Sequence, residues 1–213
     1  MMRAFPKHLR SEFAVFKPLA TPVKVQDFVD AIPMNFERSG GTSRSPRAAL
    51  ARGEAQCMEG AMIAAAALWY HGEPPLLLDL RTTKRAPRKD ADHVVALFRQ
   101  GGRWGAISKT NHAVLRYREP IYRDVRELAM SYFHEYFLDN GHKTLREYSA
   151  PFDLRRCGDA WLTARHYVWD VNNALDDSRH FPVLPQGAVA KLRRADAVER
   201  AAGKVVQWRS KLR

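Results

Sequence analysis

Two residues have the types and positions that covalent chemistry needs, Cys57 and His93. Cys57 stands just before an apolar segment, residues 58–70, in which Glu59 is the single charged residue. At the first turn of a helix, unpaired backbone N–H groups and the positive end of the helix dipole favour a thiolate. His93 begins a run rich in β-branched and aromatic residues, 93–99, and an imidazole can serve as the base for a thiol nucleophile. The pattern indicates a nucleophile and its base, with His112 as the other candidate for the base. The alternatives are a small buried hydrophobe for Cys57 and a hydrogen-bonded structural histidine for His93.

A buried helix and a small antiparallel sheet are the elements that must position these residues. The segment 58–70 is apolar on every side, which is typical of a helix inside a fold, and it is too short to span a bilayer. Gly101-Gly102 supplies the positive φ that a hairpin turn needs. The predicted strands are residues 76–80, 93–99, 103–108 and 113–117. Together these elements indicate the α+β class.

The flanking segments are mainly helical in pattern. The predicted helices are residues 25–36, 46–53, 122–138, 159–175 and 191–213. An irregular arm is expected at 1–24, a basic loop at 81–89 and a linker at 180–187. We expect one domain over residues 1–213, with its core at about 45–140 and a C-terminal helical extension at about 155–213.

The composition is that of a globular protein, and it limits the classes of function. Hydrophobic residues make up 46% of the chain, and 35 Lys and Arg against 23 Asp and Glu give a net charge of +12. Two cysteines, Cys57 and Cys157, make neither a disulfide framework nor a four-cysteine zinc site. No apolar run reaches the length of a membrane span, and the N-terminus lacks the apolar part of a signal peptide. We therefore expect a cytoplasmic protein with no membrane span, metal or cofactor.

The order of these features resembles the transglutaminase-like branch of the papain-like cysteine enzymes. The matching segments, all within residues 50–110, are Gln56-Cys57-Met58-Glu59-Gly60-Ala61, His93-Val94-Val95-Ala96-Leu97-Phe98 and Gly102-Arg103-Trp104. The resemblance implies a papain-like fold, with Cys57 as the nucleophile and His93 as the base. Gln56 and Trp104 are the candidate substrate-binding residues, and the alternative for Trp104 is an aromatic that only packs in the hairpin.

The third catalytic position departs from that family. An aspartate usually stands at the end of the second hairpin strand, where this chain has Ser108. A serine accepts a hydrogen bond from an imidazole but does not offset the positive charge of its protonated form. Asn111 is closer to the Cys-His-Asn form of the triad. A chain without the orienting carboxylate can also be an inactive relative.

The length of the hairpin turn decides which residues share the face of His93, because side chains alternate along a strand. A two-residue turn, 101–102, places Ser108 and Thr110 on that face. A three-residue turn, 100–102, places Lys109 and Asn111 there, and a bulge or an early end of the strand would also free Asn111. Ser108 and Asn111 therefore both stay candidates for the third group, which holds the tautomer of the base.

Three functions are consistent with these observations. The first is cysteine-dependent acyl transfer, namely hydrolysis, deamidation or transamidation of a peptide or protein amide. The second is peptide or protein binding by an inactive relative. The third is nucleic-acid binding through the basic segments 81–89 and 191–213, which no nucleic-acid fold signature accompanies. The first function predicts that iodoacetamide labels Cys57 faster than Cys157, and that the pKa of Cys57 lies well below the free value of about 8.5.

Overall fold

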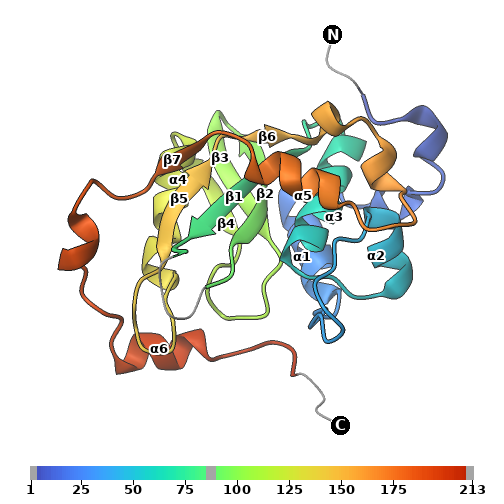
Figure 1. The fold of residues 1–213 in the computed structure, drawn as a ribbon. Helices are drawn as coiled ribbons and strands as arrows, with labels where there is room; N and C mark the ends of the chain where they lie inside the picture. Colours follow the sequence, from blue (N-terminus) through green and yellow to red (C-terminus); the bar gives the residue numbers. More distant parts are fainter. Residues whose placement is uncertain (1–3, 85–89, 210–213) are drawn as a thin grey trace.

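The computed structural model describes residues 4–84 and 90–209 and shows an α+β fold (Figure 1). Its centre is a seven-stranded antiparallel sheet in the order β4-β3-β2-β1-β5-β7, with β6 also paired to β1. The strands are β1 (Leu76–Thr82), β2 (His93–Gln100), β3 (Arg103–Ser108), β4 (Arg118–Tyr122), β5 (Leu145–Ser149), β6 (Phe152–Asp153) and β7 (His180–Pro182). The α-helices are α1 (Pro22–Ala31), α2 (Pro46–Arg52), α3 (Cys57–Tyr70), α4 (Val125–Ser131), α5 (Trp169–Asp176) and α6 (Ala197–Gly203). Short 3₁₀ turns connect several of them.

α3 is the helix predicted from the apolar segment, and it is buried along almost its whole length. Only Cys57 and Tyr70, at its two ends, keep part of their surface exposed. Its N-terminus is a capping box. The side chain of Gln56 accepts a hydrogen bond from the Met58 N–H at 2.7 Å, and the Glu59 carboxylate accepts one from the Gln56 N–H at 3.0 Å. These bonds satisfy donors at the start of the helix and fix the chain on either side of its first residue, Cys57.

The two faces of the sheet have separate hydrophobic cores. Val94 and Ala96 of β2 face α3, which α1, α2 and α5 surround. Val95 and Leu97 face the opposite side, where α4 packs. Because side chains alternate along a strand, His93, which begins β2, belongs to the face opposite α3.

The hairpin of β2 and β3 has the two-residue turn. Residues 101–102 adopt φ values of 57° and 76°, and the pairing continues from this turn to Val95 opposite Ser108. The side chain of Ser108 therefore leaves the sheet on the same face as Val95 and His93. Of the two registers that the sequence allows, the structure has the one that selects Ser108.

The sheet is larger than predicted, because the C-terminal part of the chain contributes β5, β6 and β7. β7 lies within 180–187, the segment predicted as a linker. The predicted strand at 113–117 is wrong, since β4 begins after it. Leu115 within this segment has a positive φ of 61°, and its carbonyl accepts a hydrogen bond from the Ser108 hydroxyl instead of from a neighbouring strand. Side-chain contacts thus shape the segment as a loop.

Three predicted helices are much shorter than their apolar periodicity indicates. The helices at 122–138, 159–175 and 191–213 reduce to α4, α5 and α6 with short 3₁₀ turns beside them. Before α5, tertiary hydrogen bonds compete with helical ones. The Ser45 hydroxyl donates to the Ala164 carbonyl at 2.7 Å, and the Val168 N–H donates to the Ser43 carbonyl at 2.7 Å.

Some predictions fall on segments that the structure does not describe. These are residues 1–3 of the predicted irregular arm, 85–89 of the predicted basic loop and 210–213 of the predicted terminal helix. Within the described ranges, no helix is both long enough and apolar enough to cross a membrane.

Gly60 marks a close approach between α3 and the segment after β3. A Cβ at this position would overlap the Cβ of Lys109, whose ammonium donates hydrogen bonds to the Val29 and Ile32 carbonyls. We expect Gly60→Ala to lower the free energy of unfolding by about 2 kcal/mol, because overpacking outweighs the gain of about 1 kcal/mol in helix propensity. Urea denaturation measures this change. Gly41→Ala is the control, since its new Cβ meets a neighbour at an ordinary 3.5 Å, and equal stability of both variants would contradict the prediction.

Candidate active site

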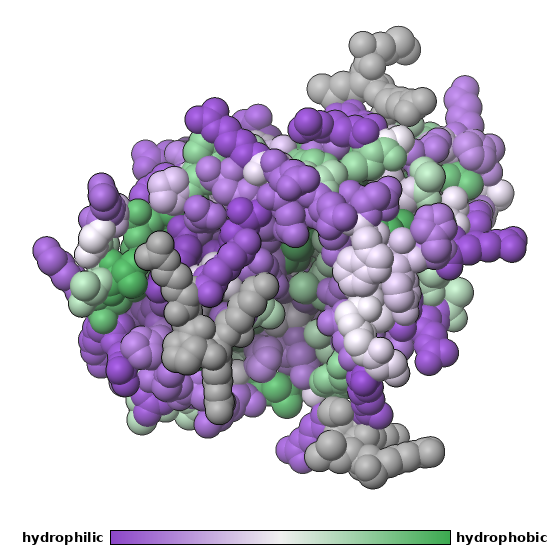
Figure 2. Space-filling model, viewed as in Figure 1, coloured by the Kyte–Doolittle hydropathy of each residue, from purple (hydrophilic) through white to green (hydrophobic). Residues whose placement is uncertain are grey.

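A pocket of about 760 Å³ lies where the N-terminus of α3 meets the start of β2 and the end of β3. On the face shown in Figure 2, a hollow near the centre is surrounded mainly by hydrophilic side chains. Cys57 lines the pocket, together with residues from the segments 34–36, 90–93, 109–115, 135–140 and 200–204. Because these segments are far apart in the sequence, the pocket is a product of tertiary structure.

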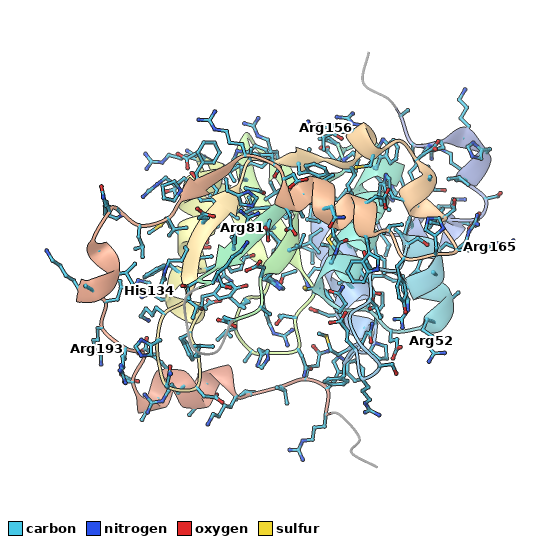
Figure 3. All side chains as sticks on the ribbon, viewed as in Figure 1. Arg52, Arg81, His134, Arg156, Arg165 and Arg193 are labelled. Carbon is cyan, nitrogen blue, oxygen red and sulfur yellow. The ribbon has the colours of Figure 1, made fainter. Side chains whose placement is uncertain are left out.

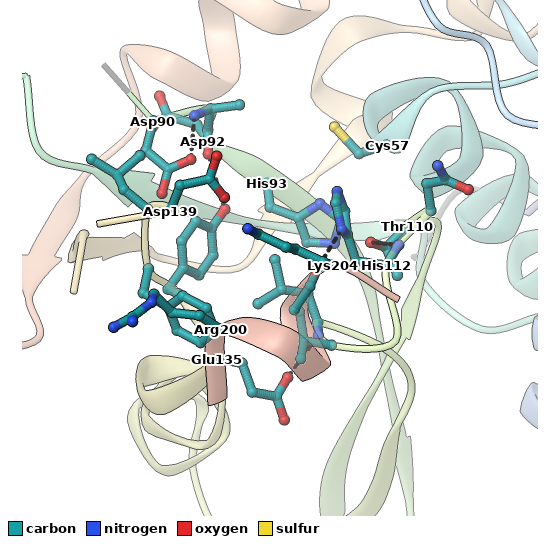
Figure 4. A pocket seen from close by; sticks show the side chains of 18 of the residues that line it. Cys57, Asp90, Asp92, His93, Thr110, His112, Glu135, Asp139, Arg200 and Lys204 are labelled. Atoms are coloured by element: carbon teal, nitrogen blue, oxygen red, sulfur yellow. Dashed lines mark hydrogen bonds between the residues drawn. The ribbon is translucent and has the colours of Figure 1, made fainter. Parts of the chain in front are cut away.

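Cys57 and His93 both line this pocket, and Figure 4 shows them on neighbouring parts of its wall. Among the described residues, no hydrogen bond joins the thiol to the imidazole. The Cys57 sulfur instead has the backbone N–H groups of Val94 and Met58 as partners, and it points away from the imidazole in Figure 4. Alternation along β2 is the cause, since Val94 faces α3 and His93 leaves the other face. The structure thus brings the two residues into one pocket without a bond between them.

Ser108 holds the imidazole of His93 in one tautomer. The Ser108 hydroxyl donates its proton to the Leu115 carbonyl at 2.5 Å, so it can only accept a hydrogen bond from Nε2 of His93, which lies 2.8 Å away. The ring proton is therefore on Nε2, and Nδ1 carries the free electron pair. That nitrogen is the one left to take a proton from a thiol.

Gln26 of α1 fixes Ser108 in turn. The Gln26 amide oxygen accepts a hydrogen bond from the Ser108 N–H, and its amide nitrogen donates one to the Ser108 carbonyl, both at 2.9 Å. Both residues are buried, so water does not compete for these bonds. The orientation of Ser108, and through it of His93, therefore depends on α1. Gln26 carries no local sequence signal for this role, because its partner is 82 positions away.

Burial keeps both candidate catalytic groups uncharged. Desolvation raises the pKa of Cys57 from 9.0 to about 11, against the opposite effect of two backbone N–H groups. Desolvation, assisted by electrostatic interactions with His112 and Arg118, lowers the pKa of His93 from 6.5 to about 4. At pH 7 the pair is a neutral thiol and a neutral imidazole. The expected low pKa of Cys57 is wrong for this resting arrangement, because burial outweighs the favourable helix N-terminus.

We expect alkylation of Cys57 by iodoacetamide to be slow at pH 7 and to accelerate up to about pH 11. The thiolate is the reacting form, and a pKa of about 11 leaves roughly one thiol in 10⁴ ionised at pH 7. Peptide mapping after timed quenching, at a series of pH values, measures the rate at each cysteine, and Cys157 serves as the reference within the sample. A Cys57 rate that reaches its plateau below pH 8 would show a preformed thiolate and contradict this expectation.

Asn111 lines the pocket, but its side-chain amide forms hydrogen bonds with the C-terminal segment, residues 200–208. Its oxygen accepts a hydrogen bond from the Trp208 N–H at 2.8 Å, and its nitrogen donates one to the Trp208 carbonyl at 2.9 Å. Backbone hydrogen bonds from the N–H groups of Gln207 and Ala113 continue this pairing. Asn111 thus anchors the C-terminal segment, and its side-chain hydrogen bonds do not reach His93.

The C-terminal segment also brings charged side chains to the pocket. His112 Nδ1 donates a hydrogen bond to the Gly203 carbonyl at 2.8 Å, and the next residue, Lys204, extends into the pocket in Figure 4. Arg200 and Asp139 line the same pocket. Within the part of the chain that the structure describes, neither Lys204 nor Asp139 forms a salt bridge. Both charges therefore remain available to a ligand.

The two predicted substrate-binding residues lie in different places. The Gln56 side chain caps α3 and donates a hydrogen bond to the Thr42 carbonyl at 2.8 Å, next to Cys57. Trp104 lies at the far end of β3, where the Arg99 guanidinium is 5.1 Å from the centre of its ring. The structure therefore places Gln56 beside the pocket and leaves Trp104 outside its lining.

Several pocket residues were not identified from the sequence. Tyr136 and Asp139 are two of them, whereas Arg200 and Lys204 belong to the basic segment 191–213, for which the sequence indicated only nucleic-acid binding. Their local patterns contain no motif, and they reach the site only because the segments 135–140 and 200–204 pack at its mouth. Across residues 4–84 and 90–209, no group of three or more His, Cys, Asp or Glu side chains is arranged to hold a metal ion.

Comparison with known proteins adds no assignment to this geometry. No protein-family model and no curated protein sequence matches the chain.

Proposed function

We propose that the protein is a cysteine-dependent acyl-transfer enzyme of transglutaminase-like type that acts on a peptide or protein amide. One observation carries this proposal: Cys57, at the first turn of a buried helix, shares a pocket with His93, whose tautomer leaves Nδ1 free. The resemblance in the order of helix, strand and hairpin supports it. The α+β fold, with a buried helix on an antiparallel sheet, is compatible with a papain-like core.

In the proposed reaction the Cys57 sulfur attacks the carbonyl carbon of an amide. Its proton passes to Nδ1 of His93 and then to the leaving amine, so a thioester forms as the C–N bond breaks. Water or a second amine then attacks the thioester, His93 takes a proton from it, and the thiol is regenerated. The first step requires the sulfur to turn from the Val94 N–H toward the imidazole, which is a rotation about one side-chain bond.

The start of α3 can stabilise the negative charge that forms on the carbonyl oxygen. Cys57 is the first residue of the helix, and its backbone N–H has no partner within the helix. Ser108 holds the tautomer of His93 but brings no negative charge to the imidazolium that forms. We therefore expect slower proton transfer than an aspartate at position 108 would allow.

Peptide or protein binding without turnover is the second candidate function. It is favoured by the raised pKa of Cys57, the lowered pKa of His93 and the absence of a hydrogen bond between them in the described structure. Under this alternative the same pocket binds a chain segment, and Lys204 and Asp139 contribute to its charge.

Trapping of the covalent intermediate tests the proposed function. The protein is mixed with small thioesters and peptide amides, quenched in acid and analysed by intact mass and peptide mapping. We expect the acyl group on Cys57, and Cys157 in the same sample serves as the control thiol. The enzyme proposal would be refuted if Cys57 were acylated no more than Cys157. Peptide binding that Cys57→Ala leaves unchanged would then favour the binding function.

A further inference from the structure

A second cleft lies between residues 142–146, at the start of β5, and residues 189–194, before α6. It has a volume of about 340 Å³ and shares no lining residue with the pocket of Cys57. None of the described residues that line it is acidic. Its basic lining residues are His142, Lys143, Arg146, Arg193 and Arg194, and its apolar ones are Val189, Ala190 and Leu192. We propose that this cleft binds a small phosphate-bearing anion.

Backbone contacts hold the two walls of the cleft together. The Ala195 N–H donates to the Gly141 carbonyl at 2.8 Å, which joins the chains that carry the two walls. The Val183 N–H donates to the Arg146 carbonyl at 2.8 Å, which fixes the wall of Arg146 against the residue after β7. Gly141 has a φ of 83°, and a Cβ there would lie 2.6 Å from the Ala195 carbonyl oxygen, so only glycine allows this approach. Figure 3 shows Arg193 beside the start of α6. The basic side chains thus come from two backbones that are fixed relative to each other.

The carboxylates near the cleft neutralise only part of its charge. Lys143 and Arg193 lie 3.5 Å and 3.8 Å from the Glu199 carboxylate, which caps the start of α6. Arg193 also donates a hydrogen bond to the Asp196 carboxylate at 3.2 Å. Arg146 and Arg194 form no salt bridge among the described residues. The Arg146 guanidinium donates to the carbonyl of the preceding residue at 2.8 Å, and burial lowers its pKa. A half-buried guanidinium without a carboxylate is energetically unfavourable, and a bound anion would offset that cost.

The shape and chemistry of the cleft favour a phosphate group over other anions. A guanidinium presents parallel N–H donors that match two phosphate oxygens, and three arginines line this small volume. At about 340 Å³ the cleft is at the lower end of the range for small-molecule sites. Val189 and Leu192 on one wall suit an organic group attached to the phosphate.

Titration calorimetry with tripolyphosphate, at fixed ionic strength and pH 7, tests the proposal. We expect the double substitution Arg146→Gln/Arg194→Gln to weaken binding by at least about tenfold. The matched control is Arg52→Gln/Arg165→Gln, which removes the same charge from arginines that Figure 3 places on the opposite side of the molecule from Arg193. Equal weakening in both double variants would show that only overall charge matters and would overturn the proposal.

A single substitution at Arg194 tests the same site if Arg146→Gln disturbs folding. Arg194 is exposed, so Arg194→Gln alone should fold normally and still weaken tripolyphosphate binding several-fold. Circular dichroism and thermal melting check each variant. An absence of tripolyphosphate binding at millimolar concentration would overturn the proposal. Binding of a single-stranded oligonucleotide without binding of tripolyphosphate would overturn it as well, in favour of a nucleic-acid surface.

Discussion

Cys57→Ala is expected to slow the cleavage of a reactive thioester by at least about 10³-fold. The proposed reaction stores the acyl group on the sulfur, and alanine leaves only the backbone N–H and the binding contacts of the pocket. The measurement is kcat/KM for the best acyl donor found by trapping, followed through the thiol that the reaction releases. The methyl side chain of alanine fits within the space of the thiol, so the fold should be retained.

Two further substitutions distinguish loss of the nucleophile from loss of structure. Cys157→Ala removes the second cysteine and should leave kcat/KM within about twofold of the original value. Ser108→Ala leaves Cys57 in place but removes the acceptor that keeps the proton of His93 on Nε2. We expect it to lower kcat with little change in KM, and a variant of Cys57 that retains full activity would refute the covalent mechanism.

The parts of the fold that followed from the sequence are those that local interactions determine. The apolar segment 58–70 is uniform over its whole length, and the structure has α3 there with Cys57 as its first residue. Gly101-Gly102 is a strong hairpin signal because only residues tolerant of positive φ suit this turn, and β2 and β3 pair around it. The choice of Ser108 over Asn111 then needed one fact, the turn length, which the structure supplies.

The relation between Cys57 and His93 could be predicted only in part. Their order along the chain indicates that a helix start and a strand start lie close together, and both residues do line one pocket. Which face of β2 carries the imidazole depends on how the sheet is covered. Leu80, opposite His93 on β1, belongs to the α4 side of the sheet, and so does His93. Periodicity cannot distinguish the faces of a strand that is buried on both of them.

The C-terminal third of the chain was the least predictable part. Its helical periodicity is real in α5 and α6, but both helices are shorter than predicted. α5 begins only at Trp169, because the chain before it is bonded to the distant residues Ser43 and Ser45. His180 forms a long-range contact with a carboxylate that the sequence does not predict. Its Nε2 lies 3.1 Å from the Asp79 carboxylate, 101 positions away, and its Nδ1 lies 2.7 Å from the Ser178 carbonyl. Desolvation raises the pKa of Asp79 to about 6 despite this histidine, and nothing in the local sequence of either residue predicts the pair.

Glu59 is a buried carboxylate whose loss should strongly lower the free energy of unfolding. It is fully buried in the first turn of α3, and its carboxylate accepts four hydrogen bonds. The donors are the Asn35 side-chain amide, the Thr42 hydroxyl, the Arg44 N–H and the Gln56 N–H, at 2.9 to 3.2 Å. The Arg44 guanidinium lies 3.7 Å away and is the positive charge beside it. One carboxylate therefore ties the loop before α2, which carries part of the pocket wall, to the helix that carries Cys57.

Glu59→Gln is expected to lower the free energy of unfolding by about 3–5 kcal/mol, since removing one partner of a buried charge pair leaves the other uncompensated. Two N–H or O–H donors would also face the new amide nitrogen, which cannot accept from them. Guanidinium denaturation followed by circular dichroism measures the change. Glu54→Gln is the matched control, because Glu54 is partly exposed and its pairs with Arg44 and Arg52 are worth less than about 1 kcal/mol. If the two variants were equally stable, the carboxylate of Glu59 would not be what joins the loop to α3.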